Sequence, residues 1–108
     1  MTDKELLEFA AKAAEINLEW DGVPDLWQPM FYKGKTYHSW EPLTDDGDAL
    51  RLAVKLEMCV STPMDNSAVA KVADVRCRIT LQACCGDRYA ATRRAIVRAA
   101  AELGKAIP

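Results

Sequence analysis

The sequence lacks the short motifs and residue clusters that usually mark catalysis. It has a single histidine, His38, and contains no glycine-rich phosphate loop, no H-E-x-x-H, no G-x-S-x-G and no internal repeat. These absences predict a protein with no enzymatic activity, no cofactor and no catalytic or metal-binding residues.

The scarcity of glycine and proline and the lack of long apolar runs narrow the class of protein further. The five glycines and five prolines form no tract and half of the residues are apolar, which argues against a disordered chain. No apolar run is long enough to span a bilayer, and the opening MTDKELLEF lacks the apolar core of a secretion signal. We therefore expect a single domain over residues 1–108 that lies in the cytoplasm, away from membranes, with its four cysteines as thiols.

The strongest local pattern runs from Trp40 to Glu57. Pro42 disfavours a helix that continues from upstream, and Thr44 is a suitable N-cap, since its hydroxyl can accept a backbone N–H of the first turn. Three aspartates follow where the helix dipole favours negative charge: Asp45, Asp46 and Asp48. The predicted buried residues are Ala49, Leu52, Ala53 and Leu56, with Leu50 and Val54 widening the stripe. This pattern predicts a central helix that its neighbours cover on more than one side.

Local patterns also define the elements on either side of this helix. Before it come a first helix, capped by Thr2 and Glu5 and ending near Ala14 or Glu15, and a short strand over 16–20. An ordered loop over 23–39 follows, in which Met30–Tyr32 and Thr36–Trp40 can form a hairpin. After the central helix come a strand over 58–62, a strand over 74–85, and a last helix capped by Asp87 with a stop near Gly104. The 74–85 strand places Cys77 and Cys85 on its buried face, and an earlier start at Val69, with an irregularity near Ala73, is an open alternative. The order α-β-β-α-β-β-α, with strands joined locally, predicts an α+β fold.

Three runs of residues resemble a known family. They are TDKELLEFAAKAA at the start, WEPLTDDGDALRLAVKL in the middle and ATRRAIVRAAAELGKA near the end. Together they are similar to the phage ABA-sandwich domain family of small bacteriophage and prophage proteins. The resemblance implies an α/β/α sandwich, in which a mostly antiparallel sheet of about four strands lies between helices. The patterns above predict three helices. It also implies the cytoplasm of a host bacterial cell, and it implies no established activity.

Six of the eight aromatic residues lie between Trp20 and Trp40. Trp and Tyr are enriched at interface hot spots, because they bury a large area while keeping a polar group. The residues that we assign to a candidate interaction surface are Trp27, Phe31, Tyr32 and Tyr37. The alternative is a cluster that packs over one face of the sheet. The leading hypothesis is a non-enzymatic phage or prophage accessory protein that binds an unidentified host or phage protein, or a second copy of itself.

Charge is divided unevenly along a chain that is close to neutral overall. Residues 1–64 carry six Lys/Arg and twelve Asp/Glu, whereas residues 65–108 carry eight and four. A candidate basic patch consists of Arg88, Arg93, Arg94 and Arg98, with Arg76 and Arg78 on the solvent face of the preceding strand. The second hypothesis is a nucleic-acid-associated module that uses these arginines. The alternative is a solvated helix face whose arginines pair with the acidic first half.

The thiols, the histidine and the aspartate run leave a third hypothesis, a small enzyme or ligand-binding protein. The residues of zinc-ligand type are Cys77, Cys84, Cys85 and His38. No C-x-x-C spacing is present, so buried thiols fit the pattern better, and a nucleophilic cysteine would need His38 as its base. The run Asp45–Asp48 lacks the alternation of a calcium loop. It favours a helix cap, or ion pairs with Arg93 or Arg94.

Overall fold

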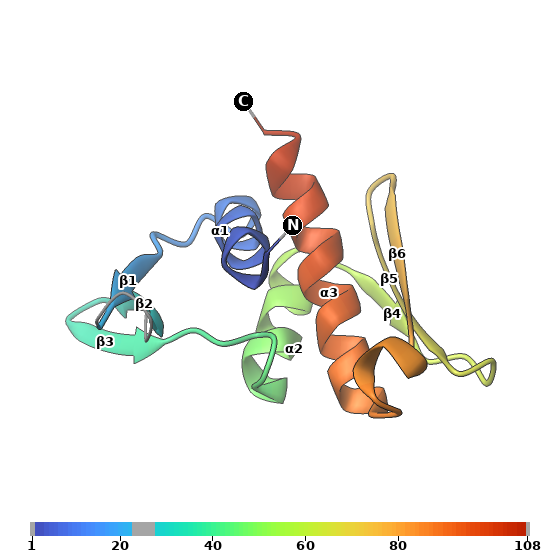
Figure 1. The fold of residues 1–108 in the computed structure, drawn as a ribbon. Coiled ribbons are helices and arrows are strands. Elements are labelled where there is room, and N and C mark those ends of the chain that lie inside the picture. Colours follow the sequence, from blue (N-terminus) through green and yellow to red (C-terminus); the bar gives the residue numbers. More distant parts are fainter. Residues whose placement is uncertain (1, 23–27, 108) are drawn as a thin grey trace.

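A computed structural model describes residues 2–22 and 28–107 of the chain. These residues form three α-helices, one short 3-10 helix (η2, Gln82–Cys84) and two three-stranded antiparallel sheets (Figure 1). The helices are α1 (Asp3–Ala13), α2 (Asp46–Lys55) and α3 (Arg88–Lys105). The first sheet consists of β1 (Glu19–Asp21), β2 (Gln28–Lys33) and β3 (Thr36–Ser39), and the second of β4 (Cys59–Ser61), β5 (Ser67–Val72) and β6 (Val75–Thr80). The predicted α+β class with three α-helices is confirmed.

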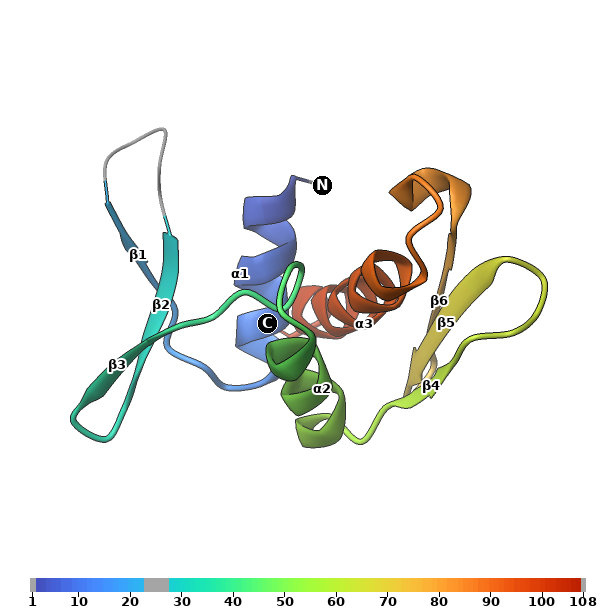
Figure 2. The same cartoon turned by 90° about the horizontal axis from the view of Figure 1, so that it is seen from below.

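The helices lie in the middle of the molecule, with one sheet at each end (Figures 1 and 2). The molecule is elongated, measuring 42 × 28 × 23 Å along its principal axes. The predicted single four-stranded sheet and the α/β/α sandwich are not confirmed, because the strands are divided between two sheets that the helices separate. Among the described residues, no helix combines the length and the apolar character needed to cross a membrane.

The second sheet exists because the predicted 74–85 strand is preceded by a tight turn. Ala73 takes a left-handed backbone conformation (φ 50°), and Val72 pairs with Val75, so that β5 runs back along β6. The turn consists of Ala73 and Asp74. Alanine gives little sequence signal for such a turn, because left-handed residues are usually Gly, Asn or Asp. The irregularity considered near Ala73 is therefore a complete reversal of the chain.

The far end of the predicted 74–85 strand also differs from expectation. Strand β6 ends at Thr80, and the chain continues into η2. Cys85 follows η2 in a left-handed conformation (φ 54°) and is exposed, so its predicted burial is wrong. Cys77 lies within β6 and is half-buried against the core.

Helix α3 is the element that the others surround. Its buried residues lie around the helix and not along one stripe: Ala91, Ala95, Ile96, Val97, Ala99, Ala100, Ala101 and Gly104. These mostly small side chains let α1, α2, β5 and β6 all pack against α3. We predicted that the helix in Trp40–Glu57 is covered on more than one side. The helix that is covered in this way is α3.

Helix α2 is buried along one stripe only. The buried residues of α2 are Ala49, Leu52 and Ala53. Leu50 and Val54 are 63% and 68% exposed, so their predicted burial is wrong. The physical reason is that α2 packs mainly against α3, and no described element covers its opposite side.

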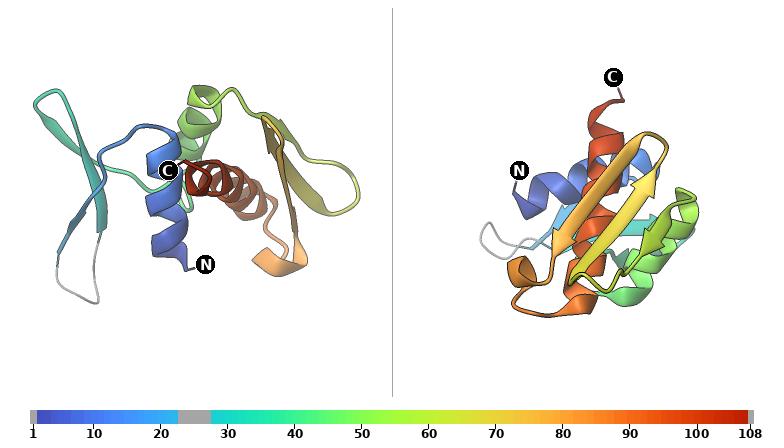
Figure 3. Two further views of the ribbon diagram at one scale, coloured as in Figure 1. Left: turned by 90° about the horizontal axis from the view of Figure 1, so that it is seen from above. Right: turned by 90° about the vertical axis from the view of Figure 1, so that its right-hand side faces the viewer.

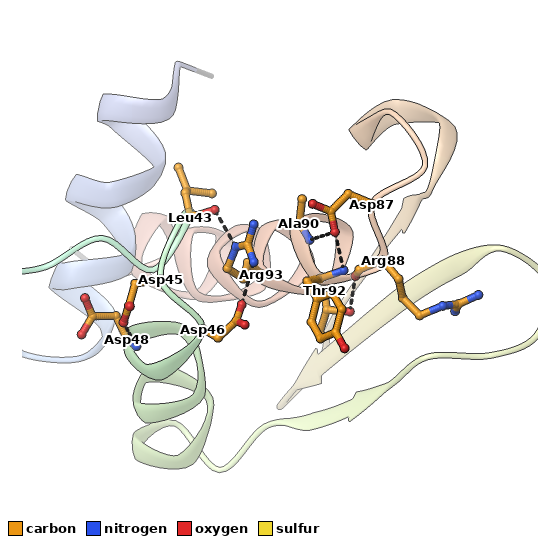
Figure 4. A network of polar contacts seen from close by, with 10 residues as sticks. Leu43, Asp45, Asp46, Asp48, Asp87, Arg88, Ala90, Thr92 and Arg93 are labelled. Carbon is orange, nitrogen blue, oxygen red and sulfur yellow. Dashed lines mark hydrogen bonds and ion pairs between the residues drawn. The ribbon is translucent and has the colours of Figure 1, made fainter.

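The predicted helix starts are confirmed at α1 and α3. Thr2 and Glu5 form the predicted capping box, and Asp87 accepts two backbone N–H groups of the first turn of α3 (Figure 4). In α2 the N-cap is Asp45 and not the predicted Thr44. The helix therefore begins one residue later than expected.

Gly104 allows a close approach of α3 to α1. The sequence predicts a helix stop near this residue, but Gly104 lies inside α3 and is buried. A Cβ atom at this position would overlap the backbone carbonyl oxygen of Phe9 and lie 3.2 Å from the backbone nitrogen of Ala13. The contact between α1 and α3 therefore requires a residue without a side chain.

Replacing Gly104 with alanine should destabilise the protein by about 3 kcal/mol, although alanine is the better helix former, because the backbone of α1 must move to admit a methyl group. Chemical denaturation measures this loss. Gly47→Ala is the matched control, since the nearest atoms to a Cβ there belong to the side chains of Arg51 and Asp45, at 3.2 and 3.3 Å. A Gly104→Ala variant as stable as the parent would contradict the close helix contact.

Candidate interaction surfaces

A groove lies between α2, α3 and the strand β4, with a volume of about 490 Å³. Its apolar lining comes from Ala49, Leu50, Ala53, Val60, Tyr89 and Ile96. Its polar lining comes from Asp46, Thr62, Arg88, Thr92 and Arg93. We call this site the α2–β4 groove.

Large apolar side chains beside the α2–β4 groove are exposed to solvent. Tyr89 is 71% exposed and Val60 is 37% exposed, in addition to the exposed Leu50. Val54 follows Leu50 one helical turn later and extends the apolar surface along α2. Contiguous exposed apolar surface of this kind marks interaction sites on folded proteins.

Strand β4 borders the groove with a free edge. It is an outer strand of the sheet β4-β5-β6, and all three of its residues are exposed. Val60 pairs with Ala70 of β5, on the sheet face that packs against α3, and lines the groove. Among the described strands, none pairs with the outer edge of β4, so the backbone groups on that edge are available to another chain.

The structure divides the predicted aromatic surface between the two faces of the first sheet. Tyr32 and Tyr37 are cross-strand partners with ring centroids 4.6 Å apart, and Tyr32 is 62% exposed. Phe31 pairs with His38 on the opposite face, where their ring centroids are 5.7 Å apart and Phe31 packs partly against the core. Trp27 lies outside the described residues. Only the two tyrosines are therefore seen together on one surface.

Two carboxylates share the outer face of the first sheet with the tyrosine pair. Glu19 of β1 pairs with Met30, which lies two residues before Tyr32 and so on the same face, and Asp21 follows two residues after Glu19. Loss of hydration raises the pKa of Tyr37, and the negative charges of Asp21 and Glu19 raise this pKa further. We call this surface, made of Glu19, Asp21, Tyr32 and Tyr37, the tyrosine–acid face.

Arg93 of the predicted basic patch is an internal clamp between α3 and the start of α2. Its Nε donates to the carbonyl oxygen of Leu43 at 2.9 Å, and its NH1 pairs with the Asp46 carboxylate at 2.6 Å (Figure 4). The Arg93 side chain is only 16% exposed. The pairing of Asp46 with Arg93, which we considered as the alternative to a metal site, is thus confirmed.

Of the other three arginines of the patch, two make contacts within the protein. Arg88 donates to the carbonyl oxygen of Pro63 at 3.3 Å, and Arg94 pairs with Asp3 of α1 at 3.2 Å. Arg98 is exposed. Arg88 and Arg94 therefore serve contacts within the protein, and Arg94 and Arg98 line one pocket beside α1.

A different set of cations gathers on the outer face of the second sheet. Lys71 and Arg76 are cross-strand partners, and Arg78 lies two residues farther along β6 on the same face. Arg78 pairs with Asp65 at 2.7 Å, and hydrogen bonds from the Ser67 hydroxyl and from Arg78 lower the pKa of Asp65. We call Lys71, Arg76 and Arg78 the basic sheet face. The sequence pattern placed the two arginines there but missed Lys71, because β5 was not recognised as a separate strand.

The histidine and the thiols lie in different parts of the molecule. His38 belongs to the first sheet, whereas the four cysteines lie in or next to the second sheet and η2, and all four are unpaired. Burial raises the pKa of the Cys77 thiol, which makes it a poorer nucleophile. Within residues 2–22 and 28–107, no three His, Cys, Asp or Glu side chains are placed to hold a metal ion.

Arg93→Ala should lower the free energy of unfolding by about 1–2 kcal/mol, because it leaves the Leu43 carbonyl and the Asp46 carboxylate without their donor. Arg94→Ala is the matched control and should change this energy by less than about 0.5 kcal/mol, since its ion pair is more exposed. Chemical denaturation of both variants tests the difference. Equal effects would show that Arg93 is an ordinary surface arginine.

Comparisons with protein-family models, with curated proteins and with solved structures found no match to this chain. The geometry of its own surfaces is therefore the basis for a proposed function.

Proposed function

We propose that this protein is a non-enzymatic binding protein that holds an extended apolar segment of another protein in the α2–β4 groove. The observation that carries the proposal is the exposure of Leu50, Val60 and Tyr89 around a single groove. Full burial of an aliphatic side chain of this size is worth about 1.5–3 kcal/mol. A partner that covers these side chains therefore gains binding energy without any rearrangement of the fold.

An extended segment suits this groove better than a compact ligand because an edge strand borders it. The backbone of such a segment can pair with the free edge of β4, while every second side chain enters the groove. The groove volume of about 490 Å³ falls within the roughly 300–1,000 Å³ of sites that bury ligands. Apolar surface also continues past the groove along α2 at Val54, which lengthens the contact.

The resemblance of three sequence runs to the phage ABA-sandwich domain family supplies the setting of the proposal. The resemblance implies that the protein is a bacteriophage or prophage accessory protein and that its partner is a host or phage protein in the bacterial cytoplasm. Binding through one apolar groove requires no catalytic residue and no cofactor, which agrees with a sequence that has no catalytic motif.

Leu50→Asp and Tyr89→Ser should each weaken binding of an extended apolar peptide by about tenfold or more, because each replaces apolar contact area with a polar group. A library of random displayed peptides is selected on the parent protein, and the enriched peptides are titrated by fluorescence polarisation. We expect the enriched peptides to alternate apolar and polar residues, as a strand beside β4 would.

Tyr32→Ser is the matched control, because this exposed tyrosine lies on the other sheet and its loss should leave peptide affinity unchanged. Circular dichroism checks that all three variants keep the fold. Peptides that bind the parent and both groove variants equally well would rule out the groove as the binding site. Peptides whose binding is lost only in the Tyr32→Ser variant would assign the binding site to the aromatic surface predicted from the sequence.

A further inference from the structure

The two sheets present outer faces of opposite charge at opposite ends of the molecule. Figure 3 shows the first sheet beyond α1 at one end, and the second sheet lying in front of α3 when it is viewed from the other end. The tyrosine–acid face looks outward from the first sheet, because Trp20 and Phe31 on its inner face pack against the core. The basic sheet face looks outward from the second sheet, because α3 packs on its inner face.

Charges on both faces are left without partners inside the molecule. Among the described residues, neither Glu19 nor Asp21 forms an ion pair within 4.0 Å. The same is true of Lys71 and Arg76 within the described ranges, whereas Arg78 is neutralised by Asp65. Because the two faces lie at opposite ends of the molecule, these two carboxylates and two cations can pair with each other only between molecules.

The side chains around these charges are also complementary. The exposed ring of Tyr32 offers a face on which a guanidinium such as that of Arg76 can stack, a contact that forms within about 6 Å of a ring centroid. Both surfaces belong to three-stranded antiparallel sheets, and sheets stack face to face at a separation of about 10 Å. Charge and stacking chemistry thus match between the two ends.

We infer that the tyrosine–acid face of one copy docks on the basic sheet face of the next copy, in a head-to-tail contact. A second copy is the occupant because both halves of the contact belong to the same chain. The two faces differ and lie at opposite ends, so the contact leaves one unused face at each end of a dimer, and further copies can add. The contact does not use the α2–β4 groove and does not depend on the function proposed for it.

Sedimentation velocity over a range of protein concentrations tests the contact. At ~50 mM NaCl the weight-average sedimentation coefficient of the parent should rise with concentration, and at ~500 mM NaCl it should return toward the monomer value, because salt screens exposed charges. A parent protein that stays monomeric at every concentration in low salt would overturn the inference.

A mixing experiment tests the head-to-tail geometry. Asp21→Arg blocks one face and Arg76→Glu blocks the other, so each variant alone should associate at least about tenfold more weakly than the parent. An equimolar mixture should regain association, because each variant keeps the face that the other needs and the reversed charges at positions 21 and 76 also attract each other. If only one of the two variants loses association and mixing restores nothing, the contact is symmetric and the inference is wrong.

Matched variants control for net charge and for the groove. Glu8→Arg and Lys55→Glu make the same changes in charge at exposed helix positions, and both should associate like the parent. Leu50→Asp should also associate like the parent, so failure of the groove proposal leaves this contact intact. If Arg76→Glu abolishes binding of single-stranded DNA and leaves self-association unchanged, the basic sheet face binds nucleic acid instead, and the inference fails.

Discussion

The close packing of α1 against α3 is the constraint on which the rest of the structure depends. Gly104 lets the backbone of α1 approach α3 at Phe9, and the alanines of α3 present small side chains on several sides of the helix. One helix can therefore contact α1, α2 and the second sheet at once, and it serves as a shared core. The first sheet stands apart from α3 and joins the core through Trp20, Phe31 and Trp40. Two sheets at opposite ends are the result.

Features decided within a few residues were predictable from the sequence. The capping box of Thr2 and Glu5 and the cap at Asp87 depend on groups within one helical turn. Burial within α2 was not predictable in this way. Leu50 and Leu52 are the same residue type on one helix, but only Leu52 faces a neighbouring element. The choice between them is made by tertiary packing. The turn at Ala73 is a second example, because a left-handed alanine costs about 1–2 kcal/mol and is sustained by pairing of the flanking strands.

The candidate surfaces were predictable in part for the same reason. Tyr32 and Tyr37 belong to a hairpin that the sequence indicates, and strand alternation is enough to separate them from Phe31. The α2–β4 groove brings together elements from different parts of the chain, such as Leu50 and Tyr89, and no local pattern connects them. Three of the four arginines of α3 make contacts within the protein, toward Asp46, Pro63 and Asp3, and no local pattern specifies these partners.

The position of the groove relative to the sheet faces gives the two proposals a joint consequence. The groove opens between α2, α3 and β4, whereas the tyrosine–acid face and the basic sheet face belong to the two sheets at opposite ends of the molecule. Copies joined end to end would leave every groove open and repeat it at intervals set by the 42 Å length of the molecule. A partner with several apolar segments would then be held at more than one groove, and the high effective concentration of the second site would strengthen binding without any new contact. Weak head-to-tail association would thus be sufficient to convert a modest groove affinity into firm retention of a multivalent partner.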